Sequence, residues 1–300
     1  MVKTNLVTPR MRTVREVVFV RRLTYVIYRI LLYSAVIIGS LVFSLPFIWM
    51  LRTSIMPSWQ VNLFPPQWIP ASIDFTPYVK VFDPGYQYTF QGWMWNSFVL
   101  SAVTSFGAVV SSAFAGFSFA RLRFPGRDIL FIMLLATMIL PEHVRLVPTY
   151  LLFTKLGWIG SYKPITVPSF FAPAFFVFML RQFFMTIPKE LDDSAFIDGC
   201  TPLGLFLRIH LPMSLPALGV VIVFNFTGMW NDFLHPLLYV KSLARFPVAV
   251  GLRVYQENFF QVKIQLMMAA AVVSIIPTII LFFVAQRHLV QGIVITGVKG

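Results

Sequence analysis

The sequence is poor in charged residues. Asp, Glu, Lys and Arg make up only 12% of its 300 residues, against roughly 25% in a typical soluble domain, while 58% are hydrophobic. A soluble domain of this length has no interior large enough to bury so much apolar surface. The composition therefore excludes a cytosolic enzyme, a secreted disulfide scaffold and a disordered tail, and it predicts an integral membrane protein.

Motifs for catalysis and metal binding are also missing. Cys200 is the only cysteine, so no intrachain disulfide can form. No glycine-rich loop ends in Gly-Lys-Ser or Gly-Lys-Thr, which excludes P-loop binding of ATP. We interpret the four histidines as interfacial polar residues, because none is paired at metal-ligand spacing: His143, His210, His235 and His288. We expect no catalytic site, no metal site and no cofactor bound by this chain.

Six stretches without charged residues are candidates for membrane spans. A bilayer core about 30 Å thick needs roughly 20 apolar residues of helix. Four stretches reach that length, namely residues 30–50, 98–119, 211–231 and 264–286. Two shorter ones are 129–141 and 164–180. Small residues recur every fourth position from 107 to 116, which predicts close helix packing within the chain, with a contact to another subunit as the alternative. The sequence thus predicts an all-α membrane protein with six spans.

The basic residues indicate the orientation of these spans. The net charge is +13, but the bases lie in short runs between apolar stretches, which favours topology signals over a nucleic-acid surface. With the N-terminus in the cytoplasm, the inside segments hold 15 Lys or Arg and the outside segments hold 9. The inside segments are 1–29, 120–128, 181–210 and 287–300. We predict that both termini are cytoplasmic.

The cytoplasmic loop 188–212 has its own helical pattern. Acidic residues cluster in the first turn of its first helix, where a helix N-terminus favours them. Gly199 ends this helix as a C′ glycine does, and Thr201 caps a second short helix. We expect one side of the first helix to be an apolar face exposed to water, made of Leu191, Ala195 and Phe196.

This loop resembles the signature of ABC-importer permeases, which reads Glu-Ala-Ala, three residues, Gly, nine residues, Ile, one residue, Leu-Pro. Here Asp193-Ser194-Ala195, Gly199 and Ile209-His210-Leu211-Pro212 keep every spacing, with Asp for Glu and Ser for the first Ala. The chain looks most similar to carbohydrate-uptake permeases, within them to the maltose-type second permease subunit. Supporting segments are 119–126, 181–184, 230–233 and 297–300.

The resemblance implies an assembly in the cell membrane. A second permease would form the pathway with this chain, two ATPase subunits would bind ATP and magnesium, and an extracytoplasmic binding protein would deliver the solute. Residues 1–29 would be a basic tail with the start of the first span, 30–290 the six-span permease domain, and 291–300 a cytoplasmic tail. The surroundings would be membrane lipid, and no nucleic acid would bind.

The resemblance also assigns roles to particular residues. The loop would dock in an ATPase cleft as a coupling helix, through Glu190, Asp193, Ser194, Ala195, Gly199, Ile209, Leu211 and Pro212. The alternative is that its apolar face packs on the membrane surface or on its own bundle. The tail would insert between the ATPases through Gly297, Val298, Lys299 and Gly300. The alternative for the tail is a frayed terminus.

Polar residues interrupt the fifth span and suggest the translocation pathway. We predict that it is lined by Asn225, Trp230, Asn231 and Asp232, because intramembrane polar groups usually face a bundle interior or a watery cavity. The alternative is a set of interhelical contacts that fix packing. Aromatic residues in 51–97 and 241–263 indicate an interfacial belt, a docking surface for the binding protein, or both.

Three other functions compete with uptake of a di- or oligosaccharide. The solute could be a polyol, a glycerol phosphate ester or another small compound, but a phosphate ester would favour Lys or Arg within the spans, where there are almost none. The second is a secondary transporter that needs no ATPase; such proteins often have two related halves, but no internal repeat is evident, and the loop 188–212 would be unexplained. The third is a structural membrane protein without a transport role.

Overall fold

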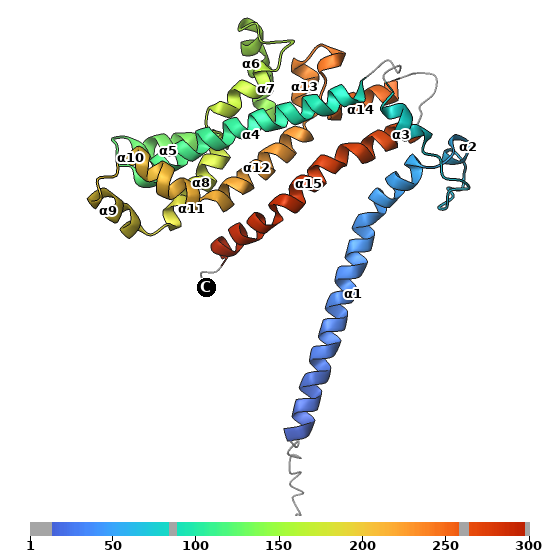
Figure 1. The fold of residues 1–300 in the computed structure, drawn as a ribbon, viewed down its shortest axis with the longest axis horizontal. Helices are drawn as coiled ribbons and strands as arrows, with labels where there is room; N and C mark the ends of the chain where they lie inside the picture. The colour runs from blue at the N-terminus through green and yellow to red at the C-terminus, as the bar shows by residue number, and fades with distance from the viewer. Residues whose placement is uncertain (1–13, 84–88, 258–263, 298–300) are drawn as a thin grey trace, which may run out of the picture. The chain divides into compact units, whose positions relative to one another are not determined.

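The computed structural model describes residues 14–83, 89–257 and 264–297, and within these ranges every regular element is a helix (Figure 1). The elements in the first half are α1 (Val14–Ser54), α2 (Ser58–Val61), α3 (Thr76–Val81), α4 (Phe90–Arg121), α5 (Arg127–Ala136) and α6 (Glu142–Lys155). Those in the second half are α7 (Lys163–Thr166), η1 (Val167–Phe170), α8 (Ala174–Thr186), α9 (Lys189–Ile197), α10 (Pro202–Leu205), η2 (Phe206–His210), α11 (Leu211–Met213), α12 (Leu215–Trp230), α13 (Leu234–Tyr239), η3 (Leu243–Arg245), α14 (Val248–Glu257) and α15 (Ile264–Gly297). The predicted all-α architecture is confirmed.

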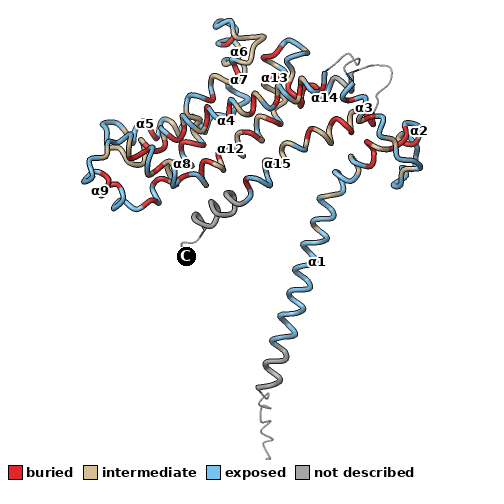
Figure 2. The backbone as a smooth tube through the Cα atoms, in the orientation of Figure 1, coloured by how far each residue is buried: buried red, intermediate tan, exposed pale blue. Residues whose placement is uncertain are grey.

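The first compact unit, Met1–Arg52, contains nearly all of α1, and the second is Thr53–Gly300. Apolar residues occur all round α1, and no residue in its most apolar 18-residue window is buried (Figure 2). A helix that is hydrophobic all round belongs in a membrane or inside a larger apolar assembly. The predicted span 30–50 lies within α1.

In the second unit, α4 is the central helix. It packs along α8 and α12, and α12 packs in turn against α15 (Figure 1). A Cβ atom on Gly107 would lie 2.7 Å from the ring of Phe170, and one on Gly116 would lie 3.1 Å from the side chain of Leu180. The small residues of α4 therefore let neighbouring helices approach closely, and the predicted packing within the chain is confirmed.

Two apolar cores lie at opposite ends of α4. The first core is centred on Phe117, Phe184 and Phe206, and it joins α4, α8, α9, α10, η2 and α12. The second core contains Trp93 and Trp230, and it joins the start of α4 to α3, α14, α15 and the end of α12. Both α4 and α12 therefore run from one core to the other, so each of these helices packs at both ends of the second unit.

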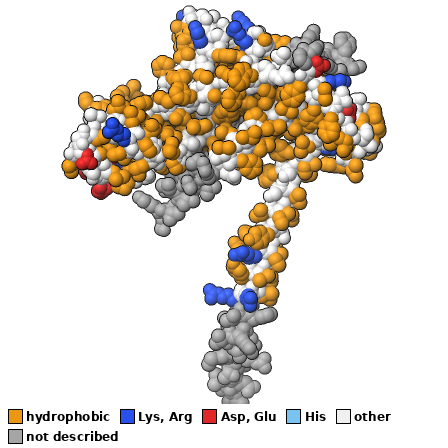
Figure 3. Space-filling view, viewed as in Figure 1, with side chains coloured by type: hydrophobic (Ala, Val, Ile, Leu, Met, Phe, Trp, Pro, Cys, Tyr) orange, Lys and Arg blue, Asp and Glu red, His pale blue; other side chains and the backbone are white. Residues whose placement is uncertain are grey.

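The surface of the second unit is apolar along these long helices. Figure 3 shows hydrophobic side chains over most of the visible face, while charged side chains gather near α9 and around α6. Large apolar residues are exposed on α4, α8, α12 and α15, among them Phe106, Phe175, Phe224 and Phe283. Such a surface is expected of helices that lie in lipid or against other membrane helices.

The described residues contain four helical segments that are long and apolar enough to cross a bilayer: Arg21–Ser54, Phe90–Arg121, Lys163–Thr186 and Ile264–Gln286. Pro202–Met213 and Leu215–Trp230 together make a fifth candidate, bent by 75°. These segments contain the predicted spans 30–50, 98–119, 164–180 and 264–286, and nearly all of 211–231. The chain is therefore built as a multi-pass membrane protein.

The predicted helical span 129–141 is wrong in its second part. α5 ends at Ala136, and α6 begins only at Glu142. Pro141 contributes to the break, because it has no N–H to donate to the carbonyl of Thr137 and it disfavours the helical conformation at Leu140. Pro141 itself has φ −58° and ψ 138°, which lies outside the helical region. The ten residues of α5 are too few to cross a bilayer as one regular helix.

Candidate functional site

The loop 188–212 folds around helix α9. Glu190 and Asp192 lie in its first turn, where the helix dipole favours acidic side chains. Gly199 follows the helix with φ +76°, and its N–H donates to the carbonyl of Phe196 at 3.0 Å. No atom of the described residues lies within 4 Å of the place where a Cβ on Gly199 would be, so glycine is favoured there for its backbone conformation rather than for space. The predicted helix end is confirmed.

The second half of the loop leads into the bent span. The N–H of Gly204 donates to Oγ1 of Thr201 at 3.1 Å, so the predicted N-cap is confirmed. After α10 the chain makes the π-helical turn Phe206–His210 before α11 and α12. A π-helical turn inserts an extra residue into a helix and shifts the side chains that follow. Here it places His210 inside the first core.

The two faces of α9 lie in different surroundings. Asp192 and Ala195 are three residues apart on the face that packs into the protein, and their exposures are 8% and 7%. Leu191, Phe196 and Ile197 are exposed on the rest of the helix, Ile197 by 86%. The prediction that Ala195 belongs to the exposed apolar face is wrong, because its small side chain packs in the first core. An acidic residue, Asp192, shares the buried face.

Arg121, the last residue of α4, binds this acid. Its Nη1 donates to Oδ2 of Asp192 at 3.1 Å, and the arginine side chain is only 4% exposed. Its Nε donates to the carbonyl of Phe184 at 3.1 Å, and its Nη2 donates to the carbonyls of Phe184 and Ile187. A cation is favoured at the C-terminal end of a helix, where α8 stops. Arg121 thus connects the ends of α4 and α8 to α9.

His210 binds the other oxygen of Asp192. Its side chain is fully buried, and its Nε2 lies 2.7 Å from Oδ1 of Asp192. The imidazole also makes edge contacts with the rings of Phe117 and Phe184, at centroid distances of 5.0 and 5.8 Å. Its Nδ1 has no hydrogen-bond partner among the described residues. The interpretation of His210 as an interfacial polar residue is therefore wrong. We call Arg121, Asp192 and His210 the anchor triad.

The anchor triad could not be predicted from the sequence, for a physical reason. Arg121 and Asp192 are 71 positions apart, and no periodic pattern in a sequence relates such distant residues. One usable signal was present, because Arg121 lies in the family-like segment 119–126. Another was Asp192 itself, which is three positions before the small residue Ala195 and therefore shares its helix face.

The other predicted coupling residues surround the anchor triad. Glu190, Asp193 and Ser194 are exposed on α9, and Oγ of Ser194 donates to the carbonyl of Glu190 at 2.7 Å. Ile209 and Leu211 pack partly against the first core, and Pro212 is exposed near the start of the bent span. In the predicted tail, Gly297 is the last residue of α15, and Val298, Lys299 and Gly300 lie outside the described residues.

The predicted pathway residues make contacts within the chain. Oγ of Ser105 donates to Oδ1 of Asn225 at 3.3 Å, which joins α4 to α12. Trp230 is 3% exposed and donates through Nε1 to the carbonyl of Ser274 at 3.0 Å, which joins α12 to α15. Nδ2 of Asn231 donates to the carbonyl of Thr227, one turn back. The contacts of Asn225 and Trp230 are the interhelical kind that the sequence left as an alternative.

Asp232 belongs to a second group of polar side chains, beyond the end of α12. Nδ1 of His235 lies 2.8 Å from Oδ2 of Asp232, and its Nε2 lies 3.1 Å from Oε1 of Glu142. We call Asp232, His235 and Glu142 the outer triad. The hydrogen bond to Asp232, helped by the charges of Asp232 and Glu142, raises the pKa of His235 against the opposing effect of burial. No group of three or more His, Cys, Asp and Glu in the described part of the chain is placed to hold a metal ion.

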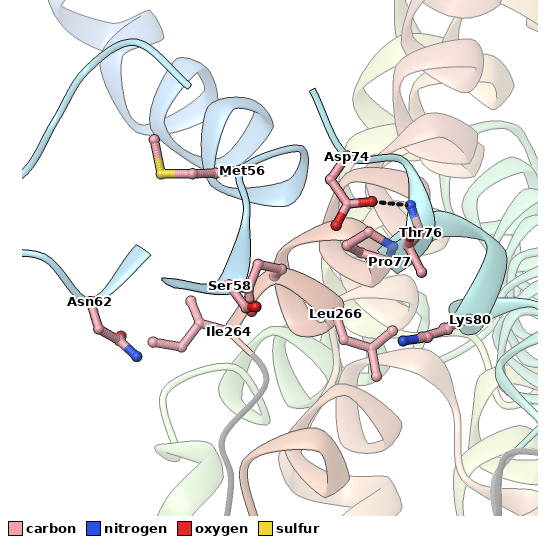
Figure 4. A pocket seen from close by; sticks show the side chains of 10 residues that line it. Met56, Ser58, Asn62, Asp74, Thr76, Pro77, Lys80, Ile264 and Leu266 are labelled. Atoms are coloured by element: carbon pink, nitrogen blue, oxygen red, sulfur yellow. Dashed lines mark hydrogen bonds between the residues drawn. The ribbon is translucent and has the colours of Figure 1, made fainter. Parts of the chain in front are cut away.

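A pocket of about 540 Å³ lies in the second unit beside α2, α3 and the start of α15 (Figure 4). Polar and apolar side chains line it together, namely Met56, Ser58, Asn62, Asp74, Thr76, Pro77, Lys80, Ile264, Gln265 and Leu266. The N–H of Thr76 donates to Oδ1 of Asp74 at 2.9 Å. Hydrogen bonds from Thr76 lower the pKa of Asp74. This pocket could not be predicted from the sequence, because its walls come from three separate segments.

Known proteins resemble this chain over most of its length. Residues 108–295 match the family described as binding-protein-dependent transport system inner membrane component. The arabinooligosaccharides transport system permease protein AraQ of Bacillus subtilis (strain 168) is 32% identical over 284 residues, which are 91% of this chain and 97% of the relative. The sn-glycerol-3-phosphate transport system permease protein UgpE of Brucella abortus (strain 2308) is 34% identical over 68% of this chain and 72% of the relative.

A solved structure has the same fold. It is the crystal structure of a bacterial ABC transporter involved in the import of the acidic polysaccharide alginate, and it matches with a TM-score of 0.77 at 20% identity. The match covers 93% of this chain and 99% of that one. The signature spacing around Gly199, the match over 108–295 and the relatives lead to one conclusion. The chain belongs to the binding-protein-dependent transport system inner membrane components and is a permease of the ABC-importer type.

Proposed function

We propose that this chain is one of two permease subunits in an ATP-driven importer of a di- or oligosaccharide. The observation that carries the proposal is the two-faced helix α9, which is fixed to the protein by Asp192 and exposes Leu191, Phe196 and Ile197. An exposed apolar group of this kind marks a surface for a partner. An ATPase subunit covers it, and α9 is the coupling helix.

Three partners follow from this assignment. A second permease, different from this chain, completes the pathway, and two ATPase subunits bind ATP and magnesium. A solute-binding protein delivers the sugar from outside, in keeping with the family description. The present chain has no catalytic site, and the exposed apolar helices, including α1, are covered by lipid and by the second permease.

Transport follows from the motion of α9. ATP closes the ATPase dimer and moves the two coupling helices with it. Rigid-body rotation of the permease halves then changes access from one side of the membrane to the other. ATP shifts this equilibrium only by its different affinity for the two states. In this chain the exposed residues Glu190, Asp193 and Ser194 contact the ATPase, and Ala195 and Gly199 shape the helix that presents them. Ile209, Leu211 and Pro212 carry the motion into α12.

The chain crosses the membrane six times, with both termini and α9 in the cytoplasm. Five crossings are the four long helices and the bent pair Pro202–Met213 and Leu215–Trp230. The remaining crossing is made by α5 and the turn after it. The N–H groups of residues 137, 138 and 139 donate to carbonyls three positions back, which extends the helical path beyond Ala136. The excess of Lys and Arg in the inside segments supports this orientation.

The tail beginning at Gly297 contacts the ATPases. α15 extends to Gly297, which brings the tail to the end of a membrane helix. Deletion of residues 297–300 should weaken assembly or the control of ATP hydrolysis. No change in either would contradict this assignment.

The solute is a neutral sugar, and polar residues at the end of α12 contact it. The described spans hold almost no Lys or Arg in their middle parts, which favours a neutral solute over a phosphate ester. Asn225, Asn231 and Asp232 are at least partly accessible, whereas Trp230 supports the pathway by packing on Phe226. Uptake by Asp232→Asn should show an altered preference among sugars, and an unchanged preference would remove Asp232 from the pathway.

The experiment that tests the proposal is the mass of the intact complex. The tagged chain is purified from its host in mild detergent and weighed, and ATP hydrolysis is then measured with the binding protein and a panel of sugars and glycerol phosphate esters. We expect one copy of this chain, one second permease and two ATPases, with stimulation by an oligosaccharide. Gly199→Pro should remain inserted but uncouple hydrolysis from uptake. A monomer or homodimer without ATPase in several gentle detergents would contradict the proposal.

A further inference from the structure

The anchor triad has contacts that the docking of α9 alone does not require. Asp192 lies in the first turn of α9, on the buried side of the helix that it shares with Ala195. Its two oxygens bind residues from two different elements, at 3.1 Å and 2.7 Å. Hydrogen bonds to both oxygens offset the cost of burying this carboxylate. α9 is therefore held to the protein by a polar contact, in addition to the apolar contact of Ala195.

Each member of the triad stands at the end of a different helical element. Arg121 is the last residue of α4, and it also binds the carbonyls of Phe184 and Ile187 at the end of α8. His210 is the last residue of η2, directly before α11 and the bent span. The three side chains thus join α9 to the ends of α4, α8 and η2. Charge-assisted hydrogen bonds fix orientation as well as distance, because each donor must point at its acceptor.

The surroundings of the triad prevent water from loosening it. The side chain of Arg121 is 4% exposed, that of Asp192 is 11% exposed, and that of His210 is fully buried. The rings of Phe117 and Phe184 contact the imidazole edge to face. Electrostatic contacts are stronger where water is excluded, so the anchor triad holds its helices more rigidly than an exposed ion pair would.

We propose that Arg121, Asp192 and His210 are positioning residues that make α9 and the ends of α4, α8 and η2 move as one rigid body. This inference rests on the proposed function, in which an ATPase moves α9. If α9 were held only by Ala195 and its chain connections, it could tilt when the ATPase moves it. The motion would then not reach the membrane helices. With the triad intact, the motion reaches α4 and α12, which both run to the second core.

The test uses the whole complex in lipid vesicles, with its binding protein and a transported sugar. The quantity measured is the number of ATP molecules hydrolysed for each sugar imported, per assembled complex. Asp192→Asn removes the charge that Arg121 and His210 bind while keeping the size of the side chain. We expect the ATPase to remain bound and active, and the ratio to rise about tenfold, within the range of typical coupling energies between sites.

The matched control is Asp128→Asn. Asp128 also pairs with an arginine, Arg127, at 2.9 Å near the end of α4, but its side chain is 73% exposed. We expect the ratio to stay at the wild-type value. Asp192→Glu keeps a carboxylate and should restore part of the coupling, which a loss of folding would not predict.

A second variant, His210→Phe, tests the inference if Asp192→Asn does not fold. His210→Phe places a third ring against Phe117 and Phe184 and removes only the bond to Asp192, so we expect an assembled complex with an intermediate ratio. If Asp192→Asn and His210→Phe both assemble and keep the wild-type ratio, the inference is wrong while the proposed function stands. If the wild-type chain purifies without any ATPase, the proposed function itself fails.

Discussion

The anchor triad and the outer triad contain the same chemistry in different surroundings. Each holds a histidine against carboxylate oxygens, but His210 is fully buried whereas His235 is 31% exposed. Asp192 is also bound by a buried arginine, while the second carboxylate of the outer triad belongs to Glu142, which is 61% exposed. Burial and the extra cation hold the side chains of the anchor triad in fixed positions. The second group is partly open to solvent.

The largest effect should come from removing the arginine of the anchor triad. Arg121→Met leaves Asp192 buried without its cation and removes the donors to Phe184 and Ile187. Breaking one side of a buried pair costs about 3–5 kcal/mol, and we expect a loss of stability of about that size. Thermal unfolding of the purified chain in mild detergent measures it.

The exposed pair near the same helix end provides the control. Arg127→Met breaks the contact with Asp128, which is largely in solvent, so we expect a much smaller loss of stability than for Arg121→Met. Equal losses of stability for Arg121→Met and Arg127→Met would show that burial does not make the Arg121–Asp192 pair more stabilising than the Arg127–Asp128 pair.

A smaller effect on stability is expected at two glycines whose backbone has a positive φ. Gly199 and Gly157 have φ of +76° and +68°, and in both places a Cβ would meet no atom within 4 Å in the part of the chain that the structure describes. Gly199→Ala and Gly157→Ala should each cost about 1 kcal/mol, because an L-residue is strained in the left-handed region. Only Gly199→Ala should also raise the ATP consumed per sugar imported, since Gly199 ends α9. If Gly157→Ala uncouples transport equally, the loop 188–212 has no special role.

The smallest effect concerns the pH dependence of the outer triad. The raised pKa of His235 means that the folded protein binds a proton more tightly than the unfolded chain. Its contribution to stability is therefore fully present below about pH 6.5 and is lost as the pH rises through the raised pKa. For a partly exposed group we expect less than about 1 kcal/mol. Unfolding midpoints of wild type and His235→Gln, compared from pH 5 to 9, measure it.

The expected pattern is a difference between the two proteins at low pH that disappears at high pH. A difference that grows with pH would contradict the assignment of the charged histidine to this contact.

Local signals in the sequence predicted local structure well. The cap at Thr201, the helix end at Gly199 and the close packing at Gly107 and Gly116 each depend on neighbouring residues or on one helical repeat, and all are confirmed. Pro141 was a signal for the break between α5 and α6, but the absence of charged residues, which defined the span 129–141, does not show where a proline interrupts a helix. Apolar composition predicts that a segment enters the membrane rather than where its helix ends.

The contacts that make the site could not be predicted in the same way. Ala195 looked like part of an exposed apolar face because its periodicity matches that of Leu191, and only the fold shows that it faces the first core. Trp230 looked like a pathway residue, yet its indole is buried against α15 through Ser274. The pairing of Asp192 with Arg121 and His210 depends on how four helix ends meet, which no single segment encodes.

The central claim is that the exposed side of α9 contacts an ATPase. The most direct test places a photoreactive side chain at Ile197, and in a parallel sample at Leu156 after α6, where the exposures are 86% and 50%. Illumination of the intact complex should link position 197 to the ATPase subunit and leave position 156 without such a link. An intact complex that gives no ATPase adduct from position 197, or gives one from position 156, would contradict the account.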